Sequence, residues 1–177
     1  MKFGPHGGGH GHFDKLSFIS YARGARQAAD PGTQAYGAKS HNTWDKMTVA
    51  HNTISVDGKP QAESTGKLLE WNPGAQATEI RLSAGAVYPG VEMERTLVHT
   101  AEYTLDIAEA RSVDGTEHLF DWIYHNFGSV STTLPLKAYA ELPQANGCRH
   151  LTGAKAAATG SEWQATFAQA QASQRSV

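Results

Sequence analysis

Apolar and polar residues alternate along most of this chain, with the period of two that is typical of β-strands. The clearest example is residues 102–110, where Tyr103, Leu105 and Ile107 occupy every second position. The same pattern, helped by β-branched residues, predicts strands at 15–21, 43–56, 67–71, 77–82, 91–100, 118–127, 129–139 and 162–167. The pattern therefore favours an all-β protein.

Turn-forming residues separate these segments at intervals of roughly 8 to 12 residues, a spacing typical of β-sandwiches. Residues 30–33, Asp-Pro-Gly-Thr, form one such signature, and Asp-Gly at residues 57–58 is a strong signal for a tight hairpin turn. A second Asp-Gly, at residues 114–115, turns the chain again. We therefore expect one antiparallel β-sandwich domain over residues 1–177. Its last residues, 165–177, are rich in Ala and Gln, and we expect them to be a loose terminus.

Composition narrows the function classes. The hydrophobic fraction of 40% and the charged fraction of 18% are those of a folded globular domain, and 177 residues can bury a substantial core. A net charge of −2 without any basic block gives no support to nucleic-acid binding. No run of about 18 apolar residues is present, so no membrane span is expected. Cys148 is the lone cysteine, which excludes an intrachain disulfide framework and is expected to be a packed residue.

The chemistry-bearing residues are concentrated near the beginning of the chain. Residues 4–18 hold three histidines and five glycines, followed by bulky apolar positions. In an extended segment His10, His12 and Asp14 would share one face, about 7 Å apart. Imidazole together with carboxylate suits zinc. This spacing predicts a polar site on a glycine-rich loop.

A metal site built on two loop ligands needs a third ligand from elsewhere. Asp30, in the first turn, and His51, within residues 49–53, are the candidates. A lone histidine in a strand is more often a packed, hydrogen-bonded residue, so spacing alone leaves His51 open between a ligand and a core residue.

A second group of polar residues contains His118, Asp121 and His125. Period two places Asp121 and His125 on one face of a strand and His118 on the other, so we expect structural roles for them. The chain has neither a Gly-x-Ser-x-Gly nucleophile elbow nor a phosphate-binding loop. Nucleophilic catalysis and nucleotide binding therefore find no support.

Taken together, the motifs resemble the C-terminal β-sandwich module of the heparinase II/III-like polysaccharide lyases. They lie in the family's order at residues 4–18 (Gly-Pro-His-Gly-Gly-Gly-His-Gly-His-Phe-Asp-Lys-Leu-Ser-Phe), 30–37, 51–61 and 118–125. The resemblance covers residues 4 to about 128, and the first motif is closest to the oligoalginate lyase branch. It implies a supersandwich-type module.

The resemblance also implies a reaction and a set of site residues. Members of the family cleave uronic-acid polysaccharides, such as alginate oligosaccharides or heparin-like chains, by β-elimination. Positions that match the family's zinc ligands are His12, Asp30 and His51. His10 matches the histidine that faces the substrate at the point of cleavage, and His6 and Tyr36 match substrate contacts.

The chain departs from the family in lacking the N-terminal α/α toroid. In the family that toroid supplies the catalytic tyrosine and the residue that neutralises the uronate carboxylate. We therefore expect a piece of a lyase, incomplete in isolation, whose partners are an acidic polysaccharide and a toroid domain; the family implies a periplasmic or secreted location. Two alternatives stay open: a non-catalytic carbohydrate-binding module, and a cupin-like metal enzyme with its ligands inside a closed barrel.

Overall fold

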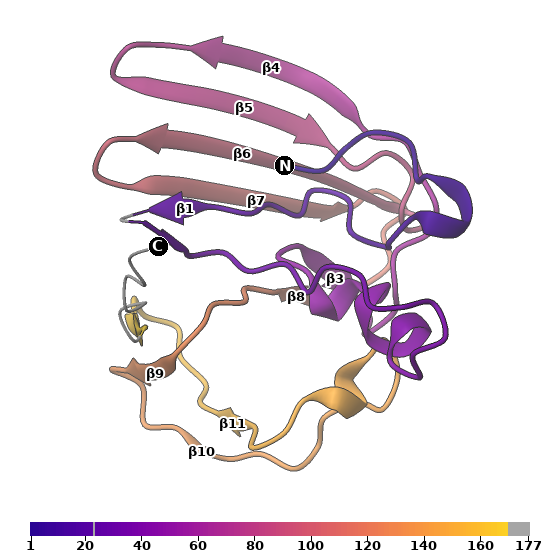
Figure 1. Cartoon of the computed structure of the whole chain (residues 1–177), viewed down its shortest axis with the longest axis vertical. Coiled ribbons are helices and arrows are strands. Elements are labelled where there is room, and N and C mark those ends of the chain that lie inside the picture. The colour runs from indigo at the N-terminus through magenta and orange to yellow at the C-terminus, as the bar shows by residue number, and fades with distance from the viewer. Residues whose placement is uncertain (23, 170–177) are drawn as a thin grey trace, which may run out of the picture.

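The structure is a computed structural model that describes residues 1–22 and 24–169. Four antiparallel strands in sequence order form its main sheet, at the top of Figure 1. They are β4 (Lys67–Pro73), β5 (Ala77–Ser83), β6 (Val91–Thr100) and β7 (Thr104–Ser112). The strands predicted at 67–71, 77–82, 91–100 and 102–110 are thus confirmed.

Shorter strand pairs form the other side of the molecule (Figure 1). The pairs are β1 (Tyr21–Ala22) with β2 (Ala25–Arg26), β3 (Ile54–Val56) with β8 (Phe120–Trp122), β9 (Ser129–Thr132) with β12 (Ala165–Ala168), and β10 (Lys137–Ala138) with β11 (Lys155–Ala156). Helical turns are η1 (Gly8–His10), η2 (His41–Asp45), η3 (Thr48–Ala50) and η4 (Cys148–His150). The result is an antiparallel β-sandwich, as predicted.

The hydrophobic core lies between one face of the main sheet and the segments that cross it. Leu82 on β5 and Met93 on β6 point inward from the sheet. Ile54 and Val56 on β3 meet them from the opposite side, together with Leu16. This packing places the segments around Leu16 and around Ile54, which adjoin candidate-site residues, against the sheet.

Several predicted elements differ from the structure. Residues 43–53 are not a strand, because they form η2, η3 and a turn before β3 begins. Of the first predicted strand, 15–21, only Tyr21 belongs to a strand, and Leu16 has a left-handed backbone (φ 65°). The tight turn at 57–58 is present, yet β3 pairs with β8 and not with the next strand.

The C-terminal part differs as well. Of the predicted strand 118–127, only β8 is a strand, and the segment 129–139 contains two short strands, β9 and β10. The segment expected to be loose begins with β12, while residues 170–177 lie outside the described part.

The topology decides against one alternative. Within the described residues, β4 and β7 are the two free edges of an open sheet, and the remaining strands form separate pairs. A cupin-like closed barrel is therefore wrong. Among the helical turns described, none is long and apolar enough to cross a membrane.

Candidate metal and substrate site

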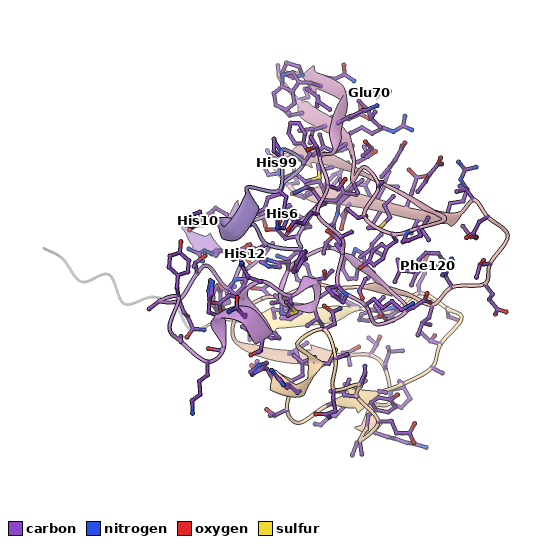
Figure 2. The ribbon with its side chains drawn as sticks, turned by 90° about the vertical axis from the view of Figure 1, so that its right-hand side faces the viewer. His6, His10, His12, Glu70, His99 and Phe120 are labelled. Atoms are coloured by element: carbon purple, nitrogen blue, oxygen red, sulfur yellow. The ribbon has the colours of Figure 1, made fainter. Side chains whose placement is uncertain are left out.

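A cavity of about 460 Å³ lies beside the glycine-rich loop. Figure 2 shows His6, His10 and His12 together around the η1 turn. The polar side chains that line the cavity are Lys2, His6, His10, His12, Asp14, Lys15, Asp30 and Thr33. The structure thus brings most of the predicted site residues to one place.

Glycine shapes the loop at two points. Gly7 begins η1 with φ 89°, a left-handed conformation that residues with a Cβ rarely adopt. At Gly11 a Cβ would lie 2.1 Å from the carbonyl oxygen of His6, so only glycine fits there. His6 in turn stacks on Phe13, with ring centroids 5.3 Å apart. The side chain of His6 is therefore held at the cavity wall.

Three possible metal ligands converge below the loop. One donor atom from each of His12, Asp14 and His51 lies within 4.8 Å of the other two. The carboxylate Oδ2 of Asp30 lies 3.2 Å from Nδ1 of His51. The structure thus groups His12 and His51 with Asp14, while the predicted ligand Asp30 contacts His51 and lies outside this group of three.

His51 is oriented by a backbone carbonyl. Its ring is fully buried, and its Nε2 donates a hydrogen bond to the carbonyl oxygen of Asp45 over 2.9 Å. Its other ring nitrogen, Nδ1, faces the carboxylate of Asp30 at 3.2 Å.

Lys2 supplies positive charge to the same cluster. Its ammonium group forms ion pairs with Asp14 and with Asp30, the latter at 3.3 Å. Burial alone would raise the pKa of Asp30, but hydrogen bonds from His51 and the backbone of Gly32, together with Lys2, hold this pKa well below its usual range. Asp30 is therefore a carboxylate at neutral pH, as a metal ligand must be.

His12 is also suited to a metal. Burial, followed by the nearby His51, lowers the pKa of His12, so the ring is neutral at pH 7. Its Nδ1 is buried, and no described residue gives it a hydrogen-bond partner, while Nε2 lies 3.2 Å from the hydroxyl of Thr33. A buried nitrogen without a partner is costly. The donor set of two imidazoles and nearby carboxylates thus fits zinc.

His10 and Tyr36 form a separate pair at the edge of the cavity. Nδ1 of His10 and the hydroxyl of Tyr36 are hydrogen-bonded at 2.5 Å, and Tyr36 packs edge-on against His41. The η1 turn directs His10 toward Tyr36, whereas His12 and Asp14 lie with His51 in the group of possible metal ligands. The expectation that His10, His12 and Asp14 share one face is therefore correct only for the last two.

Asp45 holds the loop that carries Tyr36. Its buried carboxylate accepts hydrogen bonds from the backbone and the side-chain amide of Gln34, at 2.8 and 2.9 Å, and lies 3.3 Å from Nδ1 of His41. Because the carbonyl of the same residue orients His51, Asp45 couples the Tyr36 loop to the group of possible metal ligands. No sequence pattern indicated this role.

A buried polar network connects the site to the main sheet. Asn52 donates to the carbonyl oxygens of Phe18 and Ala29, and its own oxygen accepts from the backbone of His125. The buried guanidinium of Arg95, on β6, donates to the carbonyl oxygens of Leu16 and Asn52. The segments that contain Leu16 and Asn52, next to candidate-site residues, are thus tied to one strand.

The second polar group has the structural roles expected of it. Nδ1 of His118 contacts the carboxylate of Asp57 at 2.9 Å, and Nε2 of His125 donates to the carbonyl of Val49 at 2.7 Å. These contacts join β8 to the turn after β3 and to η3. None of these histidines lines the cavity.

Two functional candidates escaped sequence reasoning. Lys2 and Lys15 line the cavity, and both bring positive charge to it. Their positions depend on how the first residues of the chain lie against residues 14–17, through hydrogen bonds between the backbones of Lys2 and Leu16 and of Lys2 and Ser17. A local pattern does not reveal this pairing.

Comparison with known proteins finds a matching family model and related sequences. The family model described as "Heparinase II/III-like, C-terminal" matches residues 1–177. An exo-oligoalginate lyase of Saccharophagus degradans is 43% identical over 61 residues, which are 29% of this chain and 8% of that protein. An alginate lyase of Stenotrophomonas maltophilia is 35% identical over 113 residues, 51% of this chain and 15% of that protein.

Solved structures show the same fold. A heparinase III gene product superimposes with a TM-score of 0.68 at 19% identity, covering 78% of this chain and 23% of that one. The heparan sulfate lyase HepC of Pedobacter heparinus gives a TM-score of 0.57 at 21% identity, covering 63% and 18% of the two chains. This chain thus spans less than a quarter of each of these proteins.

Proposed function

This chain belongs to the heparinase II/III-like C-terminal family, and on that premise we propose that it forms one wall of the active site of a polysaccharide lyase. The substrate is an acidic, uronate-containing oligosaccharide, of which alginate oligosaccharides are the first candidates because both curated relatives are alginate or oligoalginate lyases. The reaction is β-elimination, and the remaining catalytic groups come from a toroid domain.

The observation that carries this proposal is the placement of His10 and of two lysines at the same cavity. Tyr36 engages Nδ1 of His10, which leaves Nε2 free to face a sugar and to exchange a proton with it or hydrogen-bond to it. Lys2 and Lys15 line the same cavity and suit a carboxylate-bearing sugar. In β-elimination the C5 proton becomes removable once the neighbouring carboxylate is neutralised. The ammonium groups of Lys2 and Lys15 could contribute to this neutralisation.

We further propose that His12, Asp30 and His51 hold a zinc ion. Zinc, when bound, would supply the positive charge that keeps the glycine-rich loop in place. Asp45 would orient His51, and the loop would in turn fix the direction of His10. The role of the metal is then structural, with His10 as the catalytic residue and with His6 and Tyr36 as substrate contacts.

Metal content tests the zinc site. Purified wild-type chain is expected to carry about one zinc per chain by mass spectrometry. The variant His12→Ala is expected to carry none, whereas His99→Ala, an exposed histidine on β6, retains it. Ligand histidines must be neutral, so zinc should be lost below about pH 6. Equal zinc in His12→Ala, or retention at pH 4, would contradict the ligand assignment.

A domain graft tests the lyase role. The matching segment of the Stenotrophomonas alginate lyase is replaced by residues 1–177, and formation of unsaturated uronate is followed by ultraviolet absorbance. We expect elimination of oligoalginate by this graft and a loss of at least ~100-fold on His10→Ala. A folded, zinc-loaded graft that binds oligoalginate without eliminating it would favour the non-catalytic carbohydrate-binding alternative.

A further inference from the structure

A second cavity, of about 610 Å³, lies away from the histidine site, between β7, β8 and β12. Five aromatic side chains define what we call the aromatic groove: Phe18, Trp122, Tyr124, Trp163 and Phe167. None of them lines the histidine cavity. The groove is therefore a separate surface, and the proposed lyase role does not use it.

Contacts with neighbouring groups hold Trp122, Tyr124 and Phe167 in place. Trp122 and Tyr124 are parallel to within 1°, with centroids 5.8 Å apart, and Phe167 meets Tyr124 at 63°. The indole nitrogen of Trp122 donates to Asp106 over 3.2 Å. Asp106 is itself bound by two nitrogens of the buried Arg95. The aromatic platform is thus preorganised, which reduces the entropy that a ligand must overcome.

Large ring surfaces nevertheless stay exposed to water. Trp122 is 52% exposed and Trp163 is 55% exposed. Burying such a surface is favourable, at roughly 25 cal/mol per Å². Trp122 is oriented by the Arg95–Asp106 ion pair and has half of its surface exposed. It can therefore stack on a flat ligand that has an apolar face.

Polar groups between the rings indicate what kind of ligand fits. The hydroxyls of Ser20 and Thr104 and the carboxylate of Asp106 line the groove beside the aromatics. Sugar rings offer both partners that this surface needs, because their C–H faces cover aromatic rings while their hydroxyls meet polar edges. Few polar groups among apolar walls are also what small-molecule sites commonly show.

Charge separates this groove from the histidine cavity. Among the groove's described lining residues there is no lysine or arginine, and its carboxylate, Asp106, is already paired with Arg95. A uronate carboxylate would find no cation here and would approach Asp106. We propose that the aromatic groove binds an uncharged pyranose ring, which makes it a second carbohydrate site with the opposite charge preference to the first.

Two hexasaccharides that differ only in their carboxylates test this proposal. The β-1,4-linked mannohexaose and its uronate counterpart, hexamannuronate, are titrated into the wild-type chain by calorimetry. Mannohexaose is expected to bind with a Kd on the order of 1 mM or below. The variant Trp163→Ala should weaken this binding at least ~5-fold, because the exposed indole covers part of the sugar. Trp71→Ala, which removes an equally exposed tryptophan on β4, and His10→Ala should leave it unchanged.

The outcomes separate the two sites. If hexamannuronate binds and His10→Ala weakens this binding while Trp163→Ala does not, the result supports the proposed lyase role and does not involve the groove. The groove proposal is overturned if mannohexaose does not bind at concentrations well above ~1 mM. Equal affinity in Trp163→Ala and wild type, with both chains folded by circular dichroism, overturns it too, as does equal weakening of mannohexaose binding by Trp71→Ala.

Discussion

Replacing Arg95 by methionine should destabilise the whole fold, although Arg95 lies outside the candidate site. Its guanidinium is 1% exposed and is held by four contacts: two to Asp106, at 2.6 and 2.5 Å, and one each to the carbonyl oxygens of Leu16 and Asn52, at 3.0 and 2.5 Å. It also lies 4.6 Å above the ring of Phe18. Methionine preserves much of the apolar stem and removes the charge and all donors.

The loss of stability can be estimated from the groups that lose their partner when Arg95 is replaced. Breaking a buried ion pair from one side costs about 3–5 kcal/mol, because the remaining charge stays buried. Two carbonyl oxygens also lose a donor, at ~1–3 kcal/mol for each if no water replaces it, and these costs overlap. We expect Arg95→Met to lower the free energy of unfolding by about 4 kcal/mol, out of the 5–15 kcal/mol typical of a domain. At roughly 2–4 °C per kcal/mol, Tm should fall by about 8–16 °C.

Urea unfolding followed by circular dichroism measures this change as a lower midpoint with an unaltered slope. Arg81→Met is the matched control, because Arg81 pairs with Glu94 on the solvent-facing side of the same sheet and should cost less than ~1 kcal/mol. Adding Asp106→Leu to Arg95→Met should restore at least ~1 kcal/mol, since it removes the stranded charge. If Arg95→Met costs no more than Arg81→Met, the network does not tie the site to the sheet.

Two further predictions concern the polar cluster. Lys2→Met should raise zinc affinity at least ~10-fold by calorimetry, because the ammonium group of Lys2 pairs with Asp14 and Asp30 and repels a metal ion. Unchanged zinc affinity would refute this competition between Lys2 and the metal. Burial raises the pKa of Asp45, but hydrogen bonds from Gln34 and His41 outweigh it and keep the pKa below its usual value. A lowered carboxyl pKa gives stability that is present above about pH 4 and is lost as the pH falls toward the folded-state pKa. In chelator-treated protein, unfolding free energy should therefore drop below about pH 4 in wild type and drop less steeply in Asp45→Asn; equal slopes would count against the role of Asp45.

The main sheet could be predicted because its information is local. Strands β4 to β7 follow one another along the chain, and β7 and the first half of β6 alternate between more buried and more exposed positions. Residues 43–53 misled the same reasoning, since β-branched side chains there serve a polar network. Thr48, for instance, is fully buried, donates to the carbonyl of Phe13 and accepts from the backbone of Gln61. Hydrogen bonds between residues 13 to 35 positions apart cannot be read from the alternation of apolar and polar residues along a short segment.

The sequence named candidate site residues but did not indicate how they are arranged. The family resemblance pointed to His10, His12, Asp30 and His51, and the structure brings all four to the region of one cavity. Period two could not show that η1 would turn His10 toward Tyr36, because the helical turn depends on glycine conformations after Pro5. Asp45 was missed because its part is played by a backbone carbonyl as well as by its carboxylate.

The contact between Arg95 and Leu16 also bears on the order in which the protein folds. The two residues are 79 positions apart in the chain, whereas the sheet that carries Arg95 is a meander of neighbouring strands. Closing long loops is slow relative to forming local hairpins. The meander can therefore nucleate first and act as the template, with the histidine-bearing segment docking late. During synthesis the residues of the site emerge before their template does, so they stay unorganised until β6 has left the ribosome.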